Sequence, residues 1–246
     1  MTGSSPARTD AAGVVVVTRA PGSPAAKTRL AEGIGEQTCR RLREAFLDDT
    51  LGWAGSLTVC RVVSVHPPQG VAEVAARARG WVVVPQLQTE FGQRMRGAVN
   101  AGFAAGGTPV AMIATDSPTL PPERIEQAWR AVGEGGADVA LAPAGDGGWV
   151  LIACAAPLPR GCFAGVRWSA RTTLADTRAA LGRCGLGVTL LDPWYDVDTV
   201  ADLQHLVEDL RGSARRRLPC TADALAAIHD DGPELATTQR FGLFMD

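Results

Sequence analysis

The stretch GVVVVTRAPGSPAAKTRLAEG, residues 13–33, joins four valines to a loop of small residues and then to two cations that open a helical pattern. The β-branched run that ends in Gly and Pro predicts a strand buried on both faces. Gly22 allows backbone N–H groups to approach an anion, and the helix dipole, Lys27 and Arg29 favour a phosphate there. The alternative is an ordinary strand–helix turn whose two cations face water.

Apolar runs and helical patterns alternate along the rest of the chain. Strands are predicted at 14–18, 58–65, 81–85, 110–115, 138–144, 149–154 and 188–192, and helices at 28–47, 71–79, 91–105, 122–134, 171–183 and 200–210. The two runs that flank AGDGG are too close for a helical crossover, so they are expected to be antiparallel. The pattern predicts an α/β protein with three α/β/α layers and a mixed, mainly parallel sheet.

Composition favours small-molecule chemistry inside the cytoplasm. The chain has 246 residues, 46% of them hydrophobic, and a formal net charge of −2, so it can bury a large core but lacks the basic field that holds nucleic acid or an anionic membrane. The 6 cysteines form no C-x-x-C pair, which indicates a reducing compartment. No signal peptide or transmembrane run is recognised. The 3 histidines form no cluster with cysteines or carboxylates, which makes a zinc site improbable.

The chain is divided into three segments. Residues 1–12 are small and polar and are predicted to be a disordered tail. Residues 13–210 are predicted to form the α/β domain that carries the motifs described below. Residues 211–246 are expected to be a helical extension, entered through the basic run RGSARRR, which is interpreted as a solvated hinge. The apolar ending FGLFMD favours packing on the body, while a cover for the cleft or a homodimer contact stays open.

Carboxylates gather at two predicted strand ends. Asp116 directly follows an apolar strand, where its charge suits Mg²⁺ or Mn²⁺ shared with phosphate oxygens; the alternative is a turn or capping role. In DPWYDVDTVADL, Thr199 and Asp202 are expected to cap a helix, which leaves Asp196 and Asp198 for a cation. Because these two alternate on an extended segment, at most one is expected to face the metal.

A glycine-rich turn, AGDGGW at 144–149, suggests a surface for a second substrate. Asp146 offers a hydrogen-bond acceptor for hydroxyls, although a tight hairpin alone explains an Asp-Gly pair. Trp149 and Trp168 are the tryptophans expected to contact a ligand, whereas Trp53, Trp81 and Trp129 are interpreted as packing residues.

Taken together, these motifs resemble a bacterial family of GT-A-type, glycosyltransferase-like proteins associated with arsenosugar biosynthesis or radical-SAM enzymes. More distant similarity connects them to the molybdenum-cofactor and phospholactate guanylyltransferases. The resemblance is carried over residues 13–210 by RAPGSPAAKTRL, DDTL, QTEFGQRM, ATDSPTL, APAGDGGWVLI, GVRWSARTTLADT and DVDTVADL. The chain departs from the family pattern in having Trp149 for Tyr, Ala114 for Gly and Ala170 for Thr.

The resemblance implies a nucleotide-diphospho-sugar transferase fold and assigns roles to residues. Nucleotide and phosphate contacts would come from Ala20, Pro21, Gly22, Lys27, Arg29, Gln88, Gly92 and Arg94, and acceptor contacts from Asp146, Gly147, Gly148, Trp149, Trp168 and Ser169. Mg²⁺ or Mn²⁺ would be held by Asp116 and Asp198, with Asp196 beside them, and Lys27, Asp116 and Asp198 would carry the catalysis.

The predicted activity is metal-dependent transfer from a nucleotide-activated donor to a small-molecule acceptor. Glycosyl transfer from a nucleotide sugar is the first expectation. The alternative is nucleotidyl transfer, in which a phosphate or phosphonate acceptor attacks a nucleoside triphosphate and pyrophosphate leaves. A non-catalytic nucleotide-binding protein with the same fold is the second alternative.

Overall fold

The computed structural model describes residues 12–23, 28–58, 60–134, 136–212 and 214–230. Its centre is a seven-stranded sheet in the order β3-β2-β1-β4-β6-β5-β7. The strands are β1 (Gly13–Arg19), β2 (Cys60–His66), β3 (Val82–Pro85), β4 (Val110–Ala114), β5 (Val139–Pro143), β6 (Trp149–Cys154) and β7 (Val188–Leu190). β6 is antiparallel to β4 and β5, and the other pairs are parallel. The sheet is therefore mixed and mainly parallel, as predicted.

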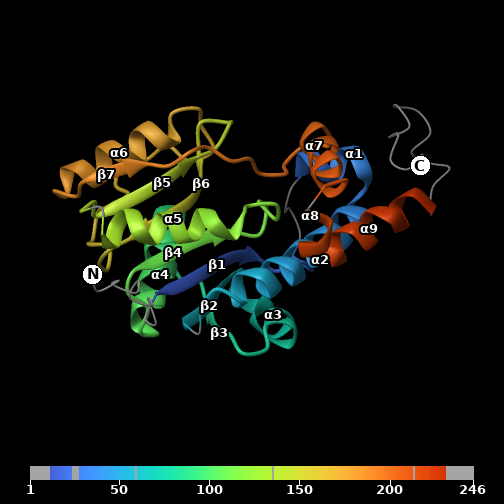
Figure 1. The fold of residues 1–246 in the computed structure, drawn as a ribbon, viewed down its shortest axis with the longest axis horizontal. Helices are drawn as coiled ribbons and strands as arrows, with labels where there is room; N and C mark the ends of the chain where they lie inside the picture. Colours follow the sequence, from blue (N-terminus) through green and yellow to red (C-terminus); the bar gives the residue numbers. More distant parts are fainter. Residues whose placement is uncertain (1–11, 24–27, 59, 135, 213, 231–246) are drawn as a thin grey trace, which may run out of the picture.

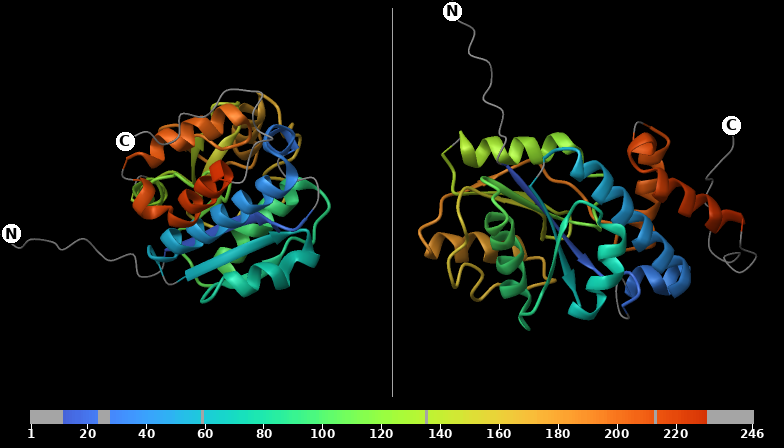
Figure 2. Two further views of the ribbon diagram at one scale, coloured as in Figure 1. Left: turned by 90° about the vertical axis from the view of Figure 1, so that its right-hand side faces the viewer. Right: turned by 90° about the horizontal axis from the view of Figure 1, so that it is seen from below.

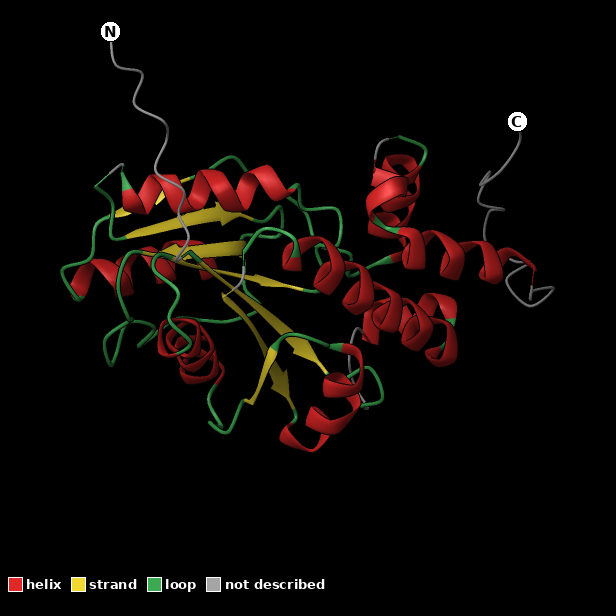
Figure 3. Cartoon of the chain, turned by 60° about the horizontal axis from the view of Figure 1, so that its bottom comes forward, coloured by secondary structure: helices red, strands yellow, loops and turns green. Residues whose placement is uncertain are grey.

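Helices cover both faces of this sheet (Figures 1, 2 and 3). They are α1 (Thr28–Ile34), α2 (Glu36–Gly55), α3 (Val71–Arg77), α4 (Phe91–Ala104), α5 (Pro122–Gly133), α6 (Thr173–Arg183), α7 (Val200–Leu210), α8 (Ala214–Arg217) and α9 (Pro219–Asp230), with a short 3₁₀ turn at Pro68–Gly70. Val14 and Val16 belong to the core on one face and Val15 to the core on the other. This alternation along β1 explains why the strand is apolar throughout.

The first predicted helix is two helices. α1 ends at Ile34 and α2 begins at Glu36, because Gly35 adopts a φ of 81°, which a right-handed helix does not accommodate. α2 also continues to Gly55, well past the predicted end at residue 47.

Two predictions about the chain ends need correction. Ala12, which was included in the tail, is buried, and its carbonyl accepts a hydrogen bond from Thr58; the preceding residues lie outside the described ranges. The basic run is only partly solvated, because Arg217 donates to the carbonyl oxygen of Thr119 at 2.6 Å and lies 5.9 Å from the Trp53 ring. FGLFMD lies outside the described residues.

The C-terminal helices lie together beside α1 and α2 (Figure 1). α9 packs on α2, and its first amides are held by the buried Asp49 of α2. No helix within the described ranges is long and apolar enough to cross a membrane. The cysteines are free, and Cys39, Cys154 and Cys162 are buried as small apolar groups.

Candidate active site

A cleft of about 530 Å³ opens at the carboxyl ends of β1 and β4. β1 pairs with β2 on one side and with β4 on the other. The chain runs outward from β1 through β2 to β3 and then returns to β4 on the other side of β1, and ligands bind at such a reversal of strand order in open α/β sheets. Pairing of Val17 with Ala114 brings Thr18 and Thr115 together, with their hydroxyl oxygens 3.3 Å apart. The cleft is lined in part by ten of the predicted site residues: Arg29, Arg94, Asp116, Asp146, Gly148, Trp149, Trp168, Ser169, Asp196 and Asp198.

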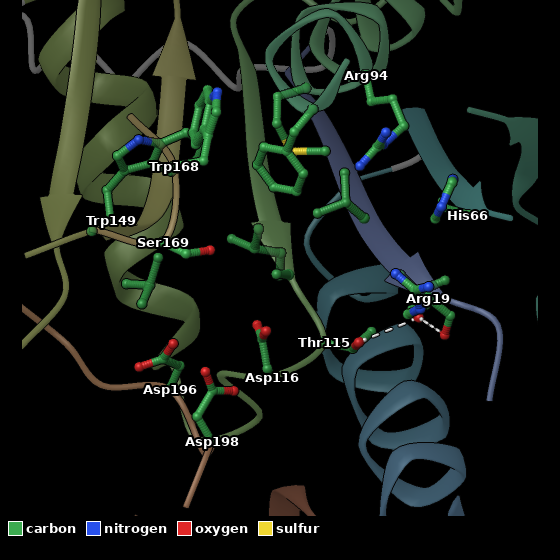
Figure 4. Close-up of a pocket in the computed structure, with 18 of the residues that line it drawn as sticks. Arg19, His66, Arg94, Thr115, Asp116, Trp149, Trp168, Ser169, Asp196 and Asp198 are labelled. Atoms are coloured by element: carbon green, nitrogen blue, oxygen red, sulfur yellow. Dashed lines mark hydrogen bonds between the residues drawn. The ribbon is translucent and has the colours of Figure 1, made fainter. Parts of the chain in front are cut away.

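Three carboxylates converge on one side of the cleft (Figure 4). Oxygen atoms of Asp116, Asp196 and Asp198 all lie within 4.8 Å of one another. Asp116 follows β4, whereas the other two belong to the extended segment between β7 and α7. Asp196 and Asp198 therefore lie on the same side, because residues two apart on an extended segment share one face, and the expectation that only one of them would point toward Asp116 is not met. We call these three residues the carboxylate triad.

Local hydrogen bonds place the triad. The backbone N–H of Val197 donates to the carbonyl oxygen of Asp116 at 2.8 Å, and the Val197 side chain is fully buried. The predicted capping box is present, since Thr199 and Asp202 bond reciprocally at the start of α7. Asp202 also accepts from the N–H of Asp198 at 3.0 Å. Because Val197 turns into the core, both neighbouring carboxylates turn toward Asp116.

Arg29, in the first turn of α1, lies next to the triad. Its Nη2 is 3.1 Å from a carboxylate oxygen of Asp198. One of the two predicted basic side chains, that of Arg29, thus lies at the edge of the cleft. Lys27 lies outside the described residues.

Of the described residues of the predicted phosphate loop, Ala20, Pro21 and Gly22 do not line the cleft. Ala20 is buried and donates its N–H to the His66 carbonyl oxygen at 2.8 Å, and the Pro21 carbonyl accepts from Arg43 at 2.6 Å. The N–H of Gly22 donates to the Glu73 carboxylate at 3.0 Å. The described part of this loop is thus anchored by protein groups.

Aromatic side chains form the wall above the triad. Trp149 and Trp168 meet edge to face with ring centroids 6.3 Å apart, and Phe91 lies 4.7 Å from Trp168. Gly92 packs under this wall, because a Cβ there would lie 3.0 Å from Phe163 and 3.3 Å from Trp168. Gly92 therefore supports the wall, although it does not line the cleft.

The acceptor-side loops are held in a defined shape. Asp146 accepts from the N–H of Gly148 at 2.8 Å. Gly147 has a φ of 93°, and a Cβ at this position would overlap the backbone of Arg171. Gly147 is thus explained by a close backbone approach. Arg167 donates to the Asp176 carboxylate at 2.8 and 2.9 Å, which holds the pKa of Asp176 well below its usual range.

Basic residues gather on the opposite side of the cleft: Arg19, His66 and Arg94 (Figure 4). Burial, followed by the charges of Arg94 and Arg19, lowers the pKa of His66. Arg19 and His66 were not among the predicted site residues. Each is the last residue of a strand, which is the signal that could have found them.

Gln88 does not reach the cleft, because its amide lies over Gly97 of α4. Gln86 lines the cleft instead; it is buried and donates its side-chain N–H to the Ser64 carbonyl at 3.0 Å. Gln86 and Gln88 are the same residue type and lie two positions apart, a spacing that puts side chains on one side of an extended segment. The sequence therefore could not tell which of the two glutamines lines the cleft.

Comparison with known proteins agrees with this geometry. Residues 52–170 match the family described as "Uncharacterized protein conserved in bacteria (DUF2064)". Over 198 residues, the chain is 28% identical to a phosphoenolpyruvate guanylyltransferase from Nocardia farcinica, a match that covers 78% of this chain and 84% of that protein.

Solved structures with the same fold include two transferases. One, from Desulfovibrio desulfuricans and assigned as a nucleotide-diphospho-sugar transferase, is 26% identical with a TM-score of 0.74, covering 89% of this chain and 97% of the other. A cytidylyltransferase from Leptospira borgpetersenii is 14% identical with a TM-score of 0.53, covering 93% and 98%, and shares the fold. The chain is therefore similar to nucleotide-using transferases, while the arsenosugar and radical-SAM grouping stays a prediction.

Proposed function

We propose that this protein transfers a group from a nucleotide-activated donor, with a divalent cation held by the carboxylate triad. The observation that carries the proposal is the convergence of three aspartate carboxylates within 4.8 Å on one side of a cleft of about 530 Å³. That volume lies in the range of small-molecule sites. Similarity to nucleotide-using transferases over most of the chain supports it.

The residues suit Mg²⁺ or Mn²⁺. Three carboxylates this close repel one another unless a positive charge intervenes, and hard oxygen ligands favour these ions. When bound, such a cation stabilises negative charge that develops on phosphate oxygens. Arg29, beside Asp198, adds a second positive charge for the leaving phosphate.

Nucleotidyl transfer is the form we favour. The match to the guanylyltransferase covers 84% of that protein. Arg29 and the cation that the triad would hold would provide the positive charge that attack on a nucleoside triphosphate requires. An oxygen of the acceptor then bonds to the α-phosphorus, and the bond to pyrophosphate breaks.

Glycosyl transfer is the second candidate, and the Desulfovibrio structure supports it. In that reaction an acceptor hydroxyl attacks the anomeric carbon of a nucleotide sugar, and a nucleoside diphosphate leaves. The aromatic wall of Trp149 and Trp168 beside Asp146 suits a sugar, since rings pack on its apolar faces while the carboxylate accepts hydroxyl hydrogens.

A thermal-shift panel tests the proposal. Nucleoside triphosphates, diphosphates and nucleotide sugars are each added with and without Mg²⁺ or Mn²⁺ to the native protein, Asp116→Asn and Asp192→Asn. Asp192 is the matched control, because it precedes the same segment but pairs with Arg124 at 2.6 Å and does not line the cleft. We expect metal-dependent stabilisation of about 3 kcal/mol at 100 times the dissociation constant, absent only in Asp116→Asn.

Product analysis then separates the two reactions. Release of pyrophosphate with a nucleotidylated acceptor, which carries the nucleoside monophosphate, supports nucleotidyl transfer. Release of a nucleoside diphosphate with a glycosylated acceptor supports glycosyl transfer. If a nucleotide binds but neither pyrophosphate nor a nucleoside diphosphate is released with any phosphate, phosphonate or hydroxyl acceptor, the non-catalytic alternative is favoured. Metal-independent binding that Asp116→Asn leaves intact contradicts the proposed role of the triad.

A further inference from the structure

The basic side of the cleft brings positive groups together from three elements. Arg19 ends β1, His66 ends β2, and Arg94 lies in the first turn of α4. All three line the cleft, on the side opposite the carboxylate triad (Figure 4). Arg94 and Arg19 are the charged groups that act on His66, and both are positive. We call this group the basic cluster.

Buried nitrogen atoms in the basic cluster lack hydrogen-bond partners. Among the described residues, neither Nδ1 of His66 nor Nε of Arg94 has a hydrogen-bond partner, although both atoms are buried. Arg94 uses Nη1 for the carbonyl of Thr89, and its guanidinium lies 5.2 Å from the centre of the Phe91 ring. A buried polar atom without a hydrogen-bond partner costs free energy. The Nε–H of Arg94 is a donor and, with the unpartnered imidazole nitrogen beside it, points to a ligand that supplies an acceptor.

Some of the other described arginines meet carboxylates, and others donate to backbone carbonyls, as Arg96 and Arg183 do. Arg77, Arg124 and Arg167 each lie within 3.0 Å of an Asp oxygen. Within the described part of the chain, no carboxylate pairs with Arg19 or Arg94. Burial, followed by the charge of Arg19, lowers the pKa of the Arg94 guanidinium, because both disfavour its charged form.

We propose that the basic cluster of Arg19, His66 and Arg94 binds a phosphate or carboxylate group of the substrate, separately from the carboxylate triad. This inference rests on the proposed function, since it assigns a second charged subsite in the same cleft. An oxyanion would accept from Arg94 and from the imidazole, and would offset the repulsion between the two arginines. Its source is either the nucleotide's phosphate tail or an acidic group on the second substrate.

Nuclear magnetic resonance of the His66 imidazole in the full chain tests the proposal. Inorganic phosphate and acetate are titrated in turn, the pKa of His66 is measured, and His66→Gln assigns the signal. We expect either anion to raise the pKa of His66 by about 1, the lower end of the effect of a close opposite charge. His205, which is exposed and stacked on Tyr195, is the internal control and should not respond.

Matched variants locate the effect. Arg94→Gln should weaken phosphate binding at least about tenfold, the loss of one charge-assisted hydrogen bond. Arg79→Gln, which changes an exposed arginine that does not line the cleft, should leave binding unchanged. Equal responses in the two variants would overturn the proposal.

Nucleotide arms identify the source of the oxyanion. If a saturating nucleoside triphosphate with Mg²⁺ raises the pKa of His66 and added phosphate does nothing more, the basic cluster holds the nucleotide's phosphates. If phosphate still raises the pKa, the cluster holds the second substrate. An uncharged nucleoside that shifts the His66 signal where both anions fail would overturn the proposal in favour of a base site.

The two proposals fail in different ways. Metal-dependent nucleotide binding with no response of His66 to any anion overturns the oxyanion subsite and leaves the transferase proposal standing. If phosphate raises the pKa of His66 but no nucleotide binds in a metal-dependent way, the transferase proposal fails and the oxyanion subsite stands.

Discussion

At the residue scale, Ser169 combines an unusual backbone with a place in the cleft. It is the non-glycine residue with positive φ within the described ranges, at 54°, and it lines the cleft beside Trp168. Left-handed backbone costs an ordinary residue about 1–2 kcal/mol. The surrounding loop holds this conformation, because the single hydroxyl hydrogen of Thr173 lies between the carbonyl oxygens of Arg167 and Ala170, which are 2.8 and 2.7 Å from Oγ1. Such strain is typical of ligand-binding positions.

Substitutions at Ser169 separate its backbone role from its side-chain role. Ser169→Gly relieves the strain but adds freedom to the unfolded chain, so the free energy of unfolding should change by less than about 1 kcal/mol. Ser169→Val should lower it by about 1–2 kcal/mol, since a β-branched side chain tolerates positive φ poorly. Urea denaturation measures both. A stable Ser169→Val variant would show that the loop relaxes and that no strain is stored.

At the element scale, Gly35 divides what would otherwise be one helix. The break points α1 toward the cleft and places Arg29 3.1 Å from Asp198, while α2 stays packed on the sheet. Gly35 has open space around it, so its φ of 81° and not crowding is the reason for glycine there.

Two glycines of this region should respond oppositely to alanine. Gly35→Ala should lower the free energy of unfolding by about 1–2 kcal/mol, because alanine resists positive φ. Gly52→Ala, in the interior of α2 with equally open space, should raise it by about 0.4–1 kcal/mol, since it removes freedom from the unfolded chain. Chemical denaturation of both variants checks this. Stabilisation by Gly35→Ala would mean that α1 and α2 merge into one helix.

At the scale of the whole molecule, the C-terminal helices are joined to the transferase fold by buried polar contacts. Asp49, only 4% exposed, accepts from the N–H groups of Cys220 and Thr221 at 3.0 and 2.7 Å. Asp49, which belongs to α2, caps the first turn of α9, and its negative charge interacts favourably with the positive end of the α9 dipole. Arg217 bonds to Thr119, three residues after the metal-ligand candidate Asp116, so the extension also supports the loop of the site.

Removing this cap should loosen the C-terminal helix. Asp49→Ala leaves two amides without their acceptor and should cost about 1–2 kcal/mol of stability. Its neighbour Asp48 makes a partly exposed ion pair with Arg77, so Asp48→Ala should cost less than about 1 kcal/mol. Hydrogen exchange should show lost protection in α9 for Asp49→Ala alone. Equal protection in both variants would refute the capping role.

The order of strands and helices could be predicted from the sequence, because β-branched runs and helical periodicity are local properties. The antiparallel step around AGDGG followed from the short distance between two apolar runs, and the capping by Asp202 followed from its spacing to Thr199. Asp116 was recognisable as a candidate for the same reason: it directly follows a buried strand.

Only the tertiary structure decided which of these groups meet. The carboxylate triad needs the chain near residue 197 to bond to the loop after β4, and the basic cluster needs the order β2-β1 with α4 alongside. Gly35 and Gln86 likewise acquire their roles from packing. Local patterns determine what each segment becomes, whereas contacts between residues far apart in sequence depend on how the segments cross, and that is settled by burial of the whole core.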